Sequence, residues 1–287
     1  MLHPLAIRPI LPAFVQLLAT GMAWAVVPVT KPPVAQRVAL ADCVVVGKVK
    51  ALEAQLVEAA PLLKIRGVDK LPYQVAVVQV ESMIIGPKDL KEVRIAYVPP
   101  QSAKGAFRRF AQVELSVDQE GCFFVRKHPD DSFYVAQASY DLTDKAKEKD
   151  FAKELQTVKR CARLLQNPSA GLKAKDAADR QLTAAILLYG YRTPTVVYTG
   201  KPKTEPIDAE QSRLILAAIA EGDWSVEVGP AQITSLSLFV RLGLREEDGW
   251  VQPRKLEDWP AAAQKWLQKH ASSYRIQKYV PEEKSPN

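Results

Sequence analysis

One short stretch combines basic and aromatic side chains in a way that suits nucleic-acid binding. It contains Lys104, Phe107, Arg108, Arg109 and Phe110. Aromatic rings can stack on bases while lysine and arginine contact phosphates, as in grooves that hold single-stranded nucleic acid. A solvated loop anchored by its two phenylalanines explains the same residues more simply. We therefore treat these five residues as a candidate interaction loop and favour the solvated loop as its interpretation.

Two of the three cysteines form a candidate disulfide. Cys43 and Cys122 fall on the expected core side of strands that could be neighbours, and an oxidising compartment would allow them to bridge. Two separate buried thiols are the favoured alternative, because free cysteine is among the most buried residue types. No cysteine, Cys161 included, belongs to a C-x-x-C pair, so the sequence indicates no zinc or thioredoxin-like site.

The tryptophans could provide stacking surfaces. Trp224 and Trp250 fall in expected loops and are candidates for exposed aromatics that stack on a sugar or on a partner side chain. Trp259 and Trp266 belong to one expected helix at the spacing of a core stripe. Core packing is the favoured interpretation of the group as a whole.

The remaining polar motifs indicate turns. His128 is followed by Pro129, Asp130 and Asp131, which is the composition of a β-turn. The acidic residues 246–248 resemble half of a calcium loop but lack its alternating ligands. The sequence contains no P-loop, dinucleotide fingerprint, G-x-S-x-G elbow or H-E-x-x-H helix. It therefore predicts no catalytic residue, no metal site and no cofactor.

Composition sets broad limits on the class of protein. The 287-residue chain carries 39 Lys and Arg against 32 Asp and Glu, a formal net charge of +7. This excess is spread along the chain, so solubility is its simplest explanation. Three cysteines are too few for a disulfide scaffold. The length suffices for two modest domains.

The first 25 residues contain the three parts of a secretory signal peptide in the required order. Arg8 provides the positive charge, residues 11–19 form a short apolar run, and Ala23-Trp24-Ala25 is an A-x-A cleavage site. We expect cleavage near Ala25, export to the periplasm or the outside of the cell, and no membrane span in the mature protein. Nucleic acid is then not the expected partner. Residues 26–38 hold three prolines and are expected to form an extended linker.

Residues 39–142 alternate in a way that predicts short strands. Every odd position from Cys43 to Ala51 is small or apolar, so this face should lie on a core. Gly47 suggests a bulge or a sharp bend. Further strands are expected at 73–85, 91–98, 113–117, 122–127 and 133–137. Such a series, with a bent first strand, predicts a small antiparallel β-barrel of OB type.

Residues 143–280 change to a helical period. Phe151, Leu155, Val158, Ala162 and Leu165 form one apolar stripe of a first helix. Other helices are expected at 174–189, at 209–221 with Asp208 as its N-cap, at 230–243 and at 259–270. About five helices with short links predict a compact helical bundle, and the polar residues 281–287 are expected to be a disordered tail. The predicted fold class is therefore α+β, an OB-like β-barrel followed by a helical bundle.

The β-rich half resembles a known family of modules. The segments ADCVVVGKV, VAVVQVESMIIG, KEVRIAYVPP, GCFFVRK and FYVAQ, all within residues 41–141, are similar to the strands of the tissue-inhibitor-of-metalloproteinase and netrin-like class. The resemblance implies an OB fold. The inhibitors of that class chelate the zinc of a protease through a cysteine at the mature N-terminus. Here the expected mature chain begins at Val26 and its first cysteine is Cys43, so the inhibitory chemistry does not carry over.

These observations support three hypotheses of function. The whole chain resembles exported bacterial proteins with the same two-part layout and no assigned activity, so the first hypothesis is an exported, non-enzymatic binding protein. Its partner would be a protein or a glycan in the envelope or outside the cell. The second is a protease-inhibitor-like protein that lacks the N-terminal zinc-chelating cysteine. The third is a carboxylate-dependent enzyme that acts on glycans and uses Trp224 or Trp250 for stacking.

Overall fold

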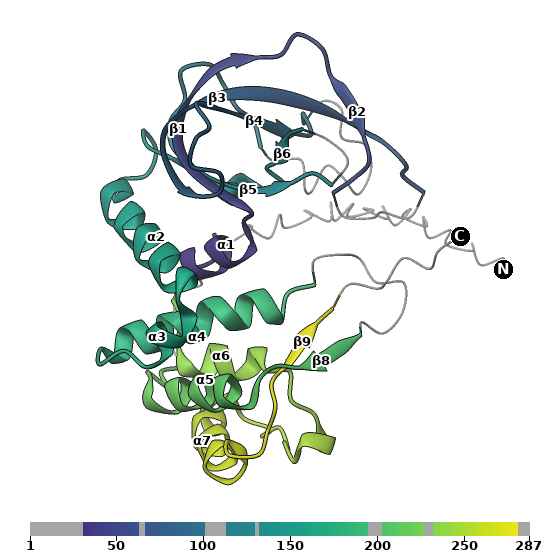
Figure 1. Cartoon of the computed structure of the whole chain (residues 1–287). Helices are drawn as coiled ribbons and strands as arrows, with labels where there is room; N and C mark the ends of the chain where they lie inside the picture. The colour runs from purple at the N-terminus through teal and green to yellow at the C-terminus, as the bar shows by residue number, and fades with distance from the viewer. Residues whose placement is uncertain are drawn as a thin grey trace, which may run out of the picture. The chain divides into compact units, whose positions relative to one another are not determined.

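The fold is described by a computed structural model (Figure 1). The structure describes residues 31–62, 67–100, 113–129, 132–194, 203–226 and 232–280. The expected signal peptide 1–25, the candidate interaction loop at 104–110 and the expected tail 281–287 lie outside the described residues.

Strand β1 (Cys43–Leu52) is the centre of the sheet. It pairs antiparallel with β3 (Leu71–Ile85) on one side and with β5 (Glu120–Lys127) on the other. The predicted inward face is confirmed, because Cys43, Val45 and Val49 are buried in one core cluster. Val44 and Val46 on the opposite face are also buried, in a second cluster made mostly of helical residues. Both faces of β1 are therefore covered.

Gly47 marks the bend that the sequence predicted. The register of β1 against β3 shifts between Val46 and Gly47, as at a β-bulge. A methyl group on Gly47 would overlap the backbone carbonyl oxygen of Gln79 and lie 2.9 Å from a methyl carbon of Val78. Glycine is required here because the neighbouring strand approaches too closely for any side chain.

The remaining strands complete a mixed sheet. β2 (Val57–Ala59) and β4 (Glu92–Tyr97) pair with β3, while β6 (Tyr134–Val135) and β7 (Leu142–Asp144) pair with β5. In the described residues these seven strands form one sheet, and its pairings run from β1 through β3, β4, β6 and β5 back to β1. The prediction of a wholly antiparallel sheet is wrong at one place, because β6 runs parallel to β4.

One predicted strand is absent from the described sheet. Residues 113–117 form no ladder, although Val113 and Leu115 are buried and Glu114 and Ser116 are exposed. The alternation is thus a real burial pattern of an extended segment. Side chains can alternate between core and solvent without the backbone pairing that defines a strand.

Seven α-helices are present in the described residues. They are α1 (Val34–Leu40), α2 (Phe151–Gln166), α3 (Pro168–Leu172), α4 (Ala177–Tyr191), α5 (Ala209–Glu221), α6 (Ser235–Arg241) and α7 (Trp259–His270). The predicted bounds are confirmed for α5 and α7 and nearly so for α2. The Asp208 carboxylate accepts the Gln211 backbone N–H at 2.9 Å, which confirms the predicted N-cap. A small ribbon of β8 (Thr204–Pro206) and β9 (Gln277–Tyr279) was not predicted.

Three helix predictions need correction. The helix expected at 174–189 begins at Ala177 and ends at Tyr191. Residues 34–38 were expected to be part of an extended linker, but they belong to α1, which begins directly after Pro33. The fourth predicted helix begins at Ser235 instead of residue 230. Thr234 caps it: its hydroxyl accepts the Ser237 N–H, while the Ser237 hydroxyl accepts the Thr234 N–H.

The sheet and the helices share one core. Val44, Val46 and Phe124 of the sheet lie in the same buried cluster as side chains from α2, α4, α5 and α7. α1 contacts both β5 and α4 (Figure 1). The domain boundary expected at 142/143 falls inside β7. Among the described helices, none combines the length and the apolar character needed to cross a membrane.

Candidate functional site

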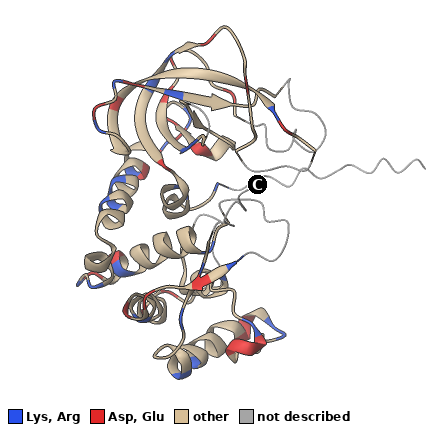
Figure 2. Cartoon of the chain, turned by 45° about the vertical axis from the view of Figure 1, so that its right-hand side comes forward, with Lys and Arg blue, Asp and Glu red and all other residues tan. Residues whose placement is uncertain are grey.

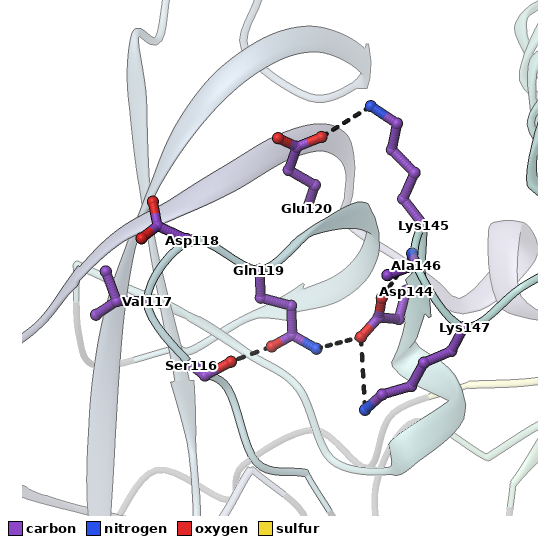
Figure 3. Close-up of a pocket in the computed structure, with 9 residues that line it drawn as sticks. All are labelled: Ser116, Val117, Asp118, Gln119, Glu120, Asp144, Lys145, Ala146 and Lys147. Carbon is purple, nitrogen blue, oxygen red and sulfur yellow. Dashed lines mark hydrogen bonds and ion pairs between the residues drawn. The ribbon is translucent and has the colours of Figure 1, made fainter.

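A hollow of about 620 Å³ opens between two turns at one end of the sheet (Figure 3). One wall is the segment from Ser116 to Glu120, which leads into β5. The other wall is the segment from Asp144 to Lys147, which leaves β7. The two walls face each other because Gly121 of β5 pairs with Asp144 of β7. We refer to this feature as the hollow.

The first wall is a turn fixed to β1. The backbone N–H of Asp118 donates to the carbonyl of Val49 at 2.9 Å, and the N–H of Val49 donates to the carbonyl of Gln119 at 2.9 Å. Asp118 has a φ of 68°, a left-handed conformation that aspartate tolerates better than most residues. The residues between the strands expected at 113–117 and 122–127 therefore form a turn, with Asp118 as its strained position.

Asp144 connects the two walls. Its carboxylate accepts a hydrogen bond from the Gln119 side-chain amide at 2.7 Å and another from the Ala146 backbone N–H at 2.9 Å. The carbonyl oxygen of Gln119's side chain in turn accepts the Ser116 N–H at 3.1 Å. Figure 3 shows this chain of contacts across the floor of the hollow. Backbone and side-chain hydrogen bonds together therefore hold the two walls of the hollow in place.

The charges of the hollow are balanced in pairs. Lys48 lies 2.8 Å from the carboxylate of Asp118, Lys145 lies 2.8 Å from Glu120, and Lys147 lies 3.6 Å from Asp144. Each of these distances joins a lysine Nζ to a carboxylate oxygen. The lining thus presents three carboxylates beside two lysines, and Lys48 of β1, which lies outside the lining, balances the third carboxylate.

Two carboxylates of the hollow, Glu120 and Asp144, have a lowered pKa. The hydrogen bond and charge of Lys145 hold the pKa of Glu120 below its ordinary value. Burial alone would raise the pKa of Asp144, but the hydrogen bonds from Gln119 and Ala146 and the charge of Lys147 outweigh it and lower the pKa overall. A general acid needs a raised pKa near neutrality. These carboxylates are suited to binding and unsuited to donating protons.

Behind the hollow lies a buried ionic cluster. Arg37 of α1 is 4% exposed and its guanidinium lies 2.5 Å from the carboxylate of Glu154 on α2. The same guanidinium donates to the Thr143 hydroxyl of β7 at 2.8 Å, and Thr143 donates to Glu154 at 2.5 Å. Lys31 lies 2.6 Å from Glu154 and 2.7 Å from Glu148. This cluster ties α1, β7 and α2 together, and it places Asp144, the residue after Thr143, at the hollow.

No local pattern in the sequence indicates this cluster. Arg37 and Glu154 are 117 positions apart, and neither belongs to a motif. The sequence predicts that Arg37 lies in an extended linker, where its side chain would be solvated. A buried arginine can be recognised only once the opposing carboxylate is known, because burial of an unpaired charge is prohibitively unfavourable.

The candidate disulfide is absent. Cys43 and Cys122 are both free and buried. The register pairs Cys122 with Val46, so Cys122 faces the helical core, whereas Cys43 faces the interior cluster of the sheet. Neighbouring strands were predicted correctly, but the two thiols lie on opposite faces. Burial raises the pKa of both thiols to about 12, so they are unreactive at neutral pH.

The expected exposure of the tryptophans is wrong for Trp250 and holds only in part for Trp224. Trp250 is 8% exposed and its ring packs edge-on against Phe239 at 4.8 Å between centroids. Trp224 is half-buried, donates its indole N–H to the Ala220 carbonyl at 3.3 Å and lies beside Phe239. The favoured alternative of core packing is confirmed for Trp250.

His128 is also an interior residue. It is fully buried, lies between the rings of Tyr73 and Phe133, and its Nε2 is 2.9 Å from the Ala60 carbonyl oxygen. Because a carbonyl oxygen only accepts, Nε2 carries the proton. The turn at residues 246–248 is a short 3₁₀ helix, and the Asp248 backbone carbonyl accepts the indole N–H of Trp266 at 2.9 Å. These residues stabilise the fold.

Comparison with known proteins adds no family. A scan against protein-family models found no match to the chain, and a search of curated protein sequences found none either.

Proposed function

We propose that this is an exported, non-enzymatic binding protein that holds a polar segment of a partner protein in the hollow. The observation that carries the proposal is the balanced set of ion pairs on two fixed walls. Lys147 and Asp118 are the most exposed members, with 82% and 77% of their side-chain surface accessible. Exposed ion pairs are weak, so they can exchange partners with an incoming ligand at little loss of free energy.

The chemistry of the walls favours a polypeptide with both acidic and basic side chains. A polyanion would be repelled by the carboxylates of Asp118, Glu120 and Asp144. A polycation would be repelled by the lysines of the same site. None of the nine described residues that line the hollow is aromatic, whereas sugar faces pack best on aromatic rings. A glycan is therefore the less suitable ligand.

We infer further that the β-rich part is an OB-like barrel and that the later helices form a bundle. The closed cycle of pairings from β1 back to β1 supports the barrel, as does the bulge at Gly47. The resemblance to the netrin-like class points the same way. Export is supported by Arg8, the apolar run 11–19 and Ala23-Trp24-Ala25. N-terminal sequencing of the exported protein should begin near Val26.

Site-specific photo-cross-linking tests the role of the hollow. Val117 lines the hollow and is 51% exposed, so a photoreactive amino acid fits there without disturbing the core. Val251, which is 77% exposed in another part of the chain, is the matched control position. Irradiation of cells that export each variant should give a discrete protein adduct from position 117 and not from position 251.

The charges provide the second arm of the experiment. In a chain that also carries Lys145→Glu and Lys147→Glu, both lysines that line the hollow are replaced by carboxylates. The lining is then wholly acidic, and the adduct from position 117 should be lost. Absence of an adduct at position 117, or the same adducts at both positions, would show that the hollow is not a protein-binding site.

A further inference from the structure

The outer face of α2 carries positive charge that the rest of the helix does not balance. α2 contains Lys153, Lys159, Arg160 and Arg163, and Glu154 is its single acidic residue. Glu154 points inward, with 14% of its side chain accessible, and is bound by Arg37 and Lys31. The one negative charge of the helix is therefore neutralised by residues from outside it, and the lysines remain in solvent.

The exposed cations are distributed over the solvent-facing side of the helix. Lys153, Lys159 and Arg163 are exposed and span about 15 Å along the axis at 1.5 Å per residue. Lys159 and Arg163 are one turn apart, whereas Lys153 lies about 120° around the helix from Lys159. Within the described part of the chain, the side-chain amines of Lys153 and Lys159 have no hydrogen-bond or ion-pair partner, and neither has the amine of the exposed Lys149 before the helix. Arg163 makes one long contact of 3.4 Å with Asp179 and keeps 68% of its side chain accessible. Figure 2 shows basic residues recurring along α2.

No exposed apolar side chain larger than alanine lies on this side of α2, whose other exposed residues are Ala152, Gln156 and Gln166. Asp150, the exposed N-cap residue between Lys149 and Lys153, is the acidic residue next to these cations in the chain. A protein partner would normally bury aromatic, methionine or arginine side chains, and lysine is depleted at the centre of protein–protein interfaces. An anionic bilayer needs no such complementarity, because its headgroups present a continuous negative surface to flexible lysines.

We propose that the basic face of Lys149, Lys153, Lys159 and Arg163 docks reversibly on a bilayer that contains anionic phospholipid. This inference is independent of the hollow, whose lysines it does not use. Without an apolar anchor the contact is purely electrostatic, so it should weaken steeply with salt. Each cation near the surface should strengthen partition by roughly fivefold.

Vesicle co-sedimentation of the full chain tests the proposal. The wild type should sediment with vesicles of phosphatidylglycerol and phosphatidylcholine at low salt and should remain in solution with phosphatidylcholine alone. The variant K153E/K159E should reduce partition by roughly twentyfold or more. Both lysines are exposed and unpaired among the described residues, so the thermal midpoint should not change.

The variant K265E/K269E is the matched control. These lysines are exposed on α7, and their reversal changes the net charge by the same amount. The two double variants differ from each other only at these four positions. Any vesicle binding by the N-terminal leader is therefore the same in both. The control should sediment as the wild type does, and K153E/K159E should leave the cross-link from position 117 unchanged.

Three results would overturn the inference. One is wild-type chain that stays in solution with anionic vesicles at low salt. Another is an equal loss of binding in the α7 control, which would assign the effect to net charge alone. The third is binding to soluble polyglutamate without binding to vesicles, which would replace the bilayer with an acidic protein.

Discussion

Single residues decide how closely the strands of this protein approach each other. Gly47 allows β1 to pair with β3 so closely that any side chain at this position would overlap the Gln79 carbonyl. The sequence predicted a bend here from a glycine in mid-strand, and the register shift confirms it. It could not predict the burial of Trp250, because the aromatic partner Phe239 comes from α6, a separate element. Local patterns report backbone geometry better than they report distant contacts.

Substitution of Gly47 by alanine should therefore be strongly destabilising. The added methyl would also lie 2.9 Å from a methyl carbon of Val78, and a backbone oxygen cannot move as a flexible side chain can. We expect a loss of about 2–4 kcal/mol in the free energy of unfolding, measured by urea denaturation. Gly190→Ala is the control, since the nearest atom to its new methyl, the Ala39 carbonyl oxygen, is 4.0 Å away. This α4 substitution should be neutral or stabilising by up to about 1 kcal/mol; equal effects at the two sites would contradict the steric argument.

The buried thiols should make stability depend on pH in the alkaline range. Burial raises the pKa of Cys43, Cys122 and Cys161 from 9.0 to about 12. Because folding raises these values, the stabilisation is complete below pH 9 and is lost as the pH rises toward 12. Each thiol should contribute a fall of up to about 1.4 kcal/mol per pH unit in this window. Urea denaturation from pH 8 upward should show a shallower decline for Cys161→Ala than for the wild type; identical slopes would contradict this account.

At the scale of elements, amphipathic helices were easier to predict than the contacts that organise them. The apolar stripe of α2 and the caps of α5 were visible in the sequence. α1 was not, because a seven-residue helix after two prolines has too few turns to show a period, and such a short helix is stable only through tertiary contacts. The parallel pairing of β6 with β4 was also beyond local pattern, since two residues carry no information on direction.

The contact that secures α1 is the ion pair between Arg37 and Glu154. Burial alone would raise the pKa of Glu154, but the hydrogen bonds from Arg37, Lys31 and Thr143 outweigh it and lower the pKa. Arg37→Met would leave this carboxylate without its most buried partner. We expect a loss of about 3 kcal/mol in the free energy of unfolding by urea denaturation. Arg163→Met, which removes an arginine with 68% of its side chain accessible, should change stability by less than about 0.5 kcal/mol.

A double variant separates the charge from the packing. Arg37→Met combined with Glu154→Leu removes both charges, so it should recover part of the stability that Arg37→Met alone loses. If the free energies of unfolding lost by Arg37→Met alone and by Glu154→Leu alone add up to the loss in the double variant, the two residues are not coupled.

For the whole molecule, the shared core matters more than the two-part layout of the sequence. The change from a β period to a helical period near residue 142 correctly marks where strands give way to helices, yet one buried cluster extends across both parts, while two others lie in the β-rich part alone. Val44, Val46 and Phe124 are buried against helical side chains. A strand with both faces apolar is the local signal for such packing. In β1 that signal is Val44 and Val46, two apolar residues at even positions next to the apolar odd positions.

A shared core predicts that the sheet and the helices unfold together. The tryptophans of the described residues, Trp224, Trp250, Trp259 and Trp266, all lie in the helical part, so their fluorescence reports on the helices. Cys43 lies in the separate interior cluster of the sheet, so its alkylation, followed by peptide mass spectrometry, reports on the sheet. The two probes should give the same urea midpoint, and Val46→Ala should lower both midpoints equally, because Val46 lies between the two parts. Separate midpoints would instead identify two independent domains, the arrangement that the change of period near residue 142 suggests, and would show that the interface between β1, β5 and the helices contributes little to either.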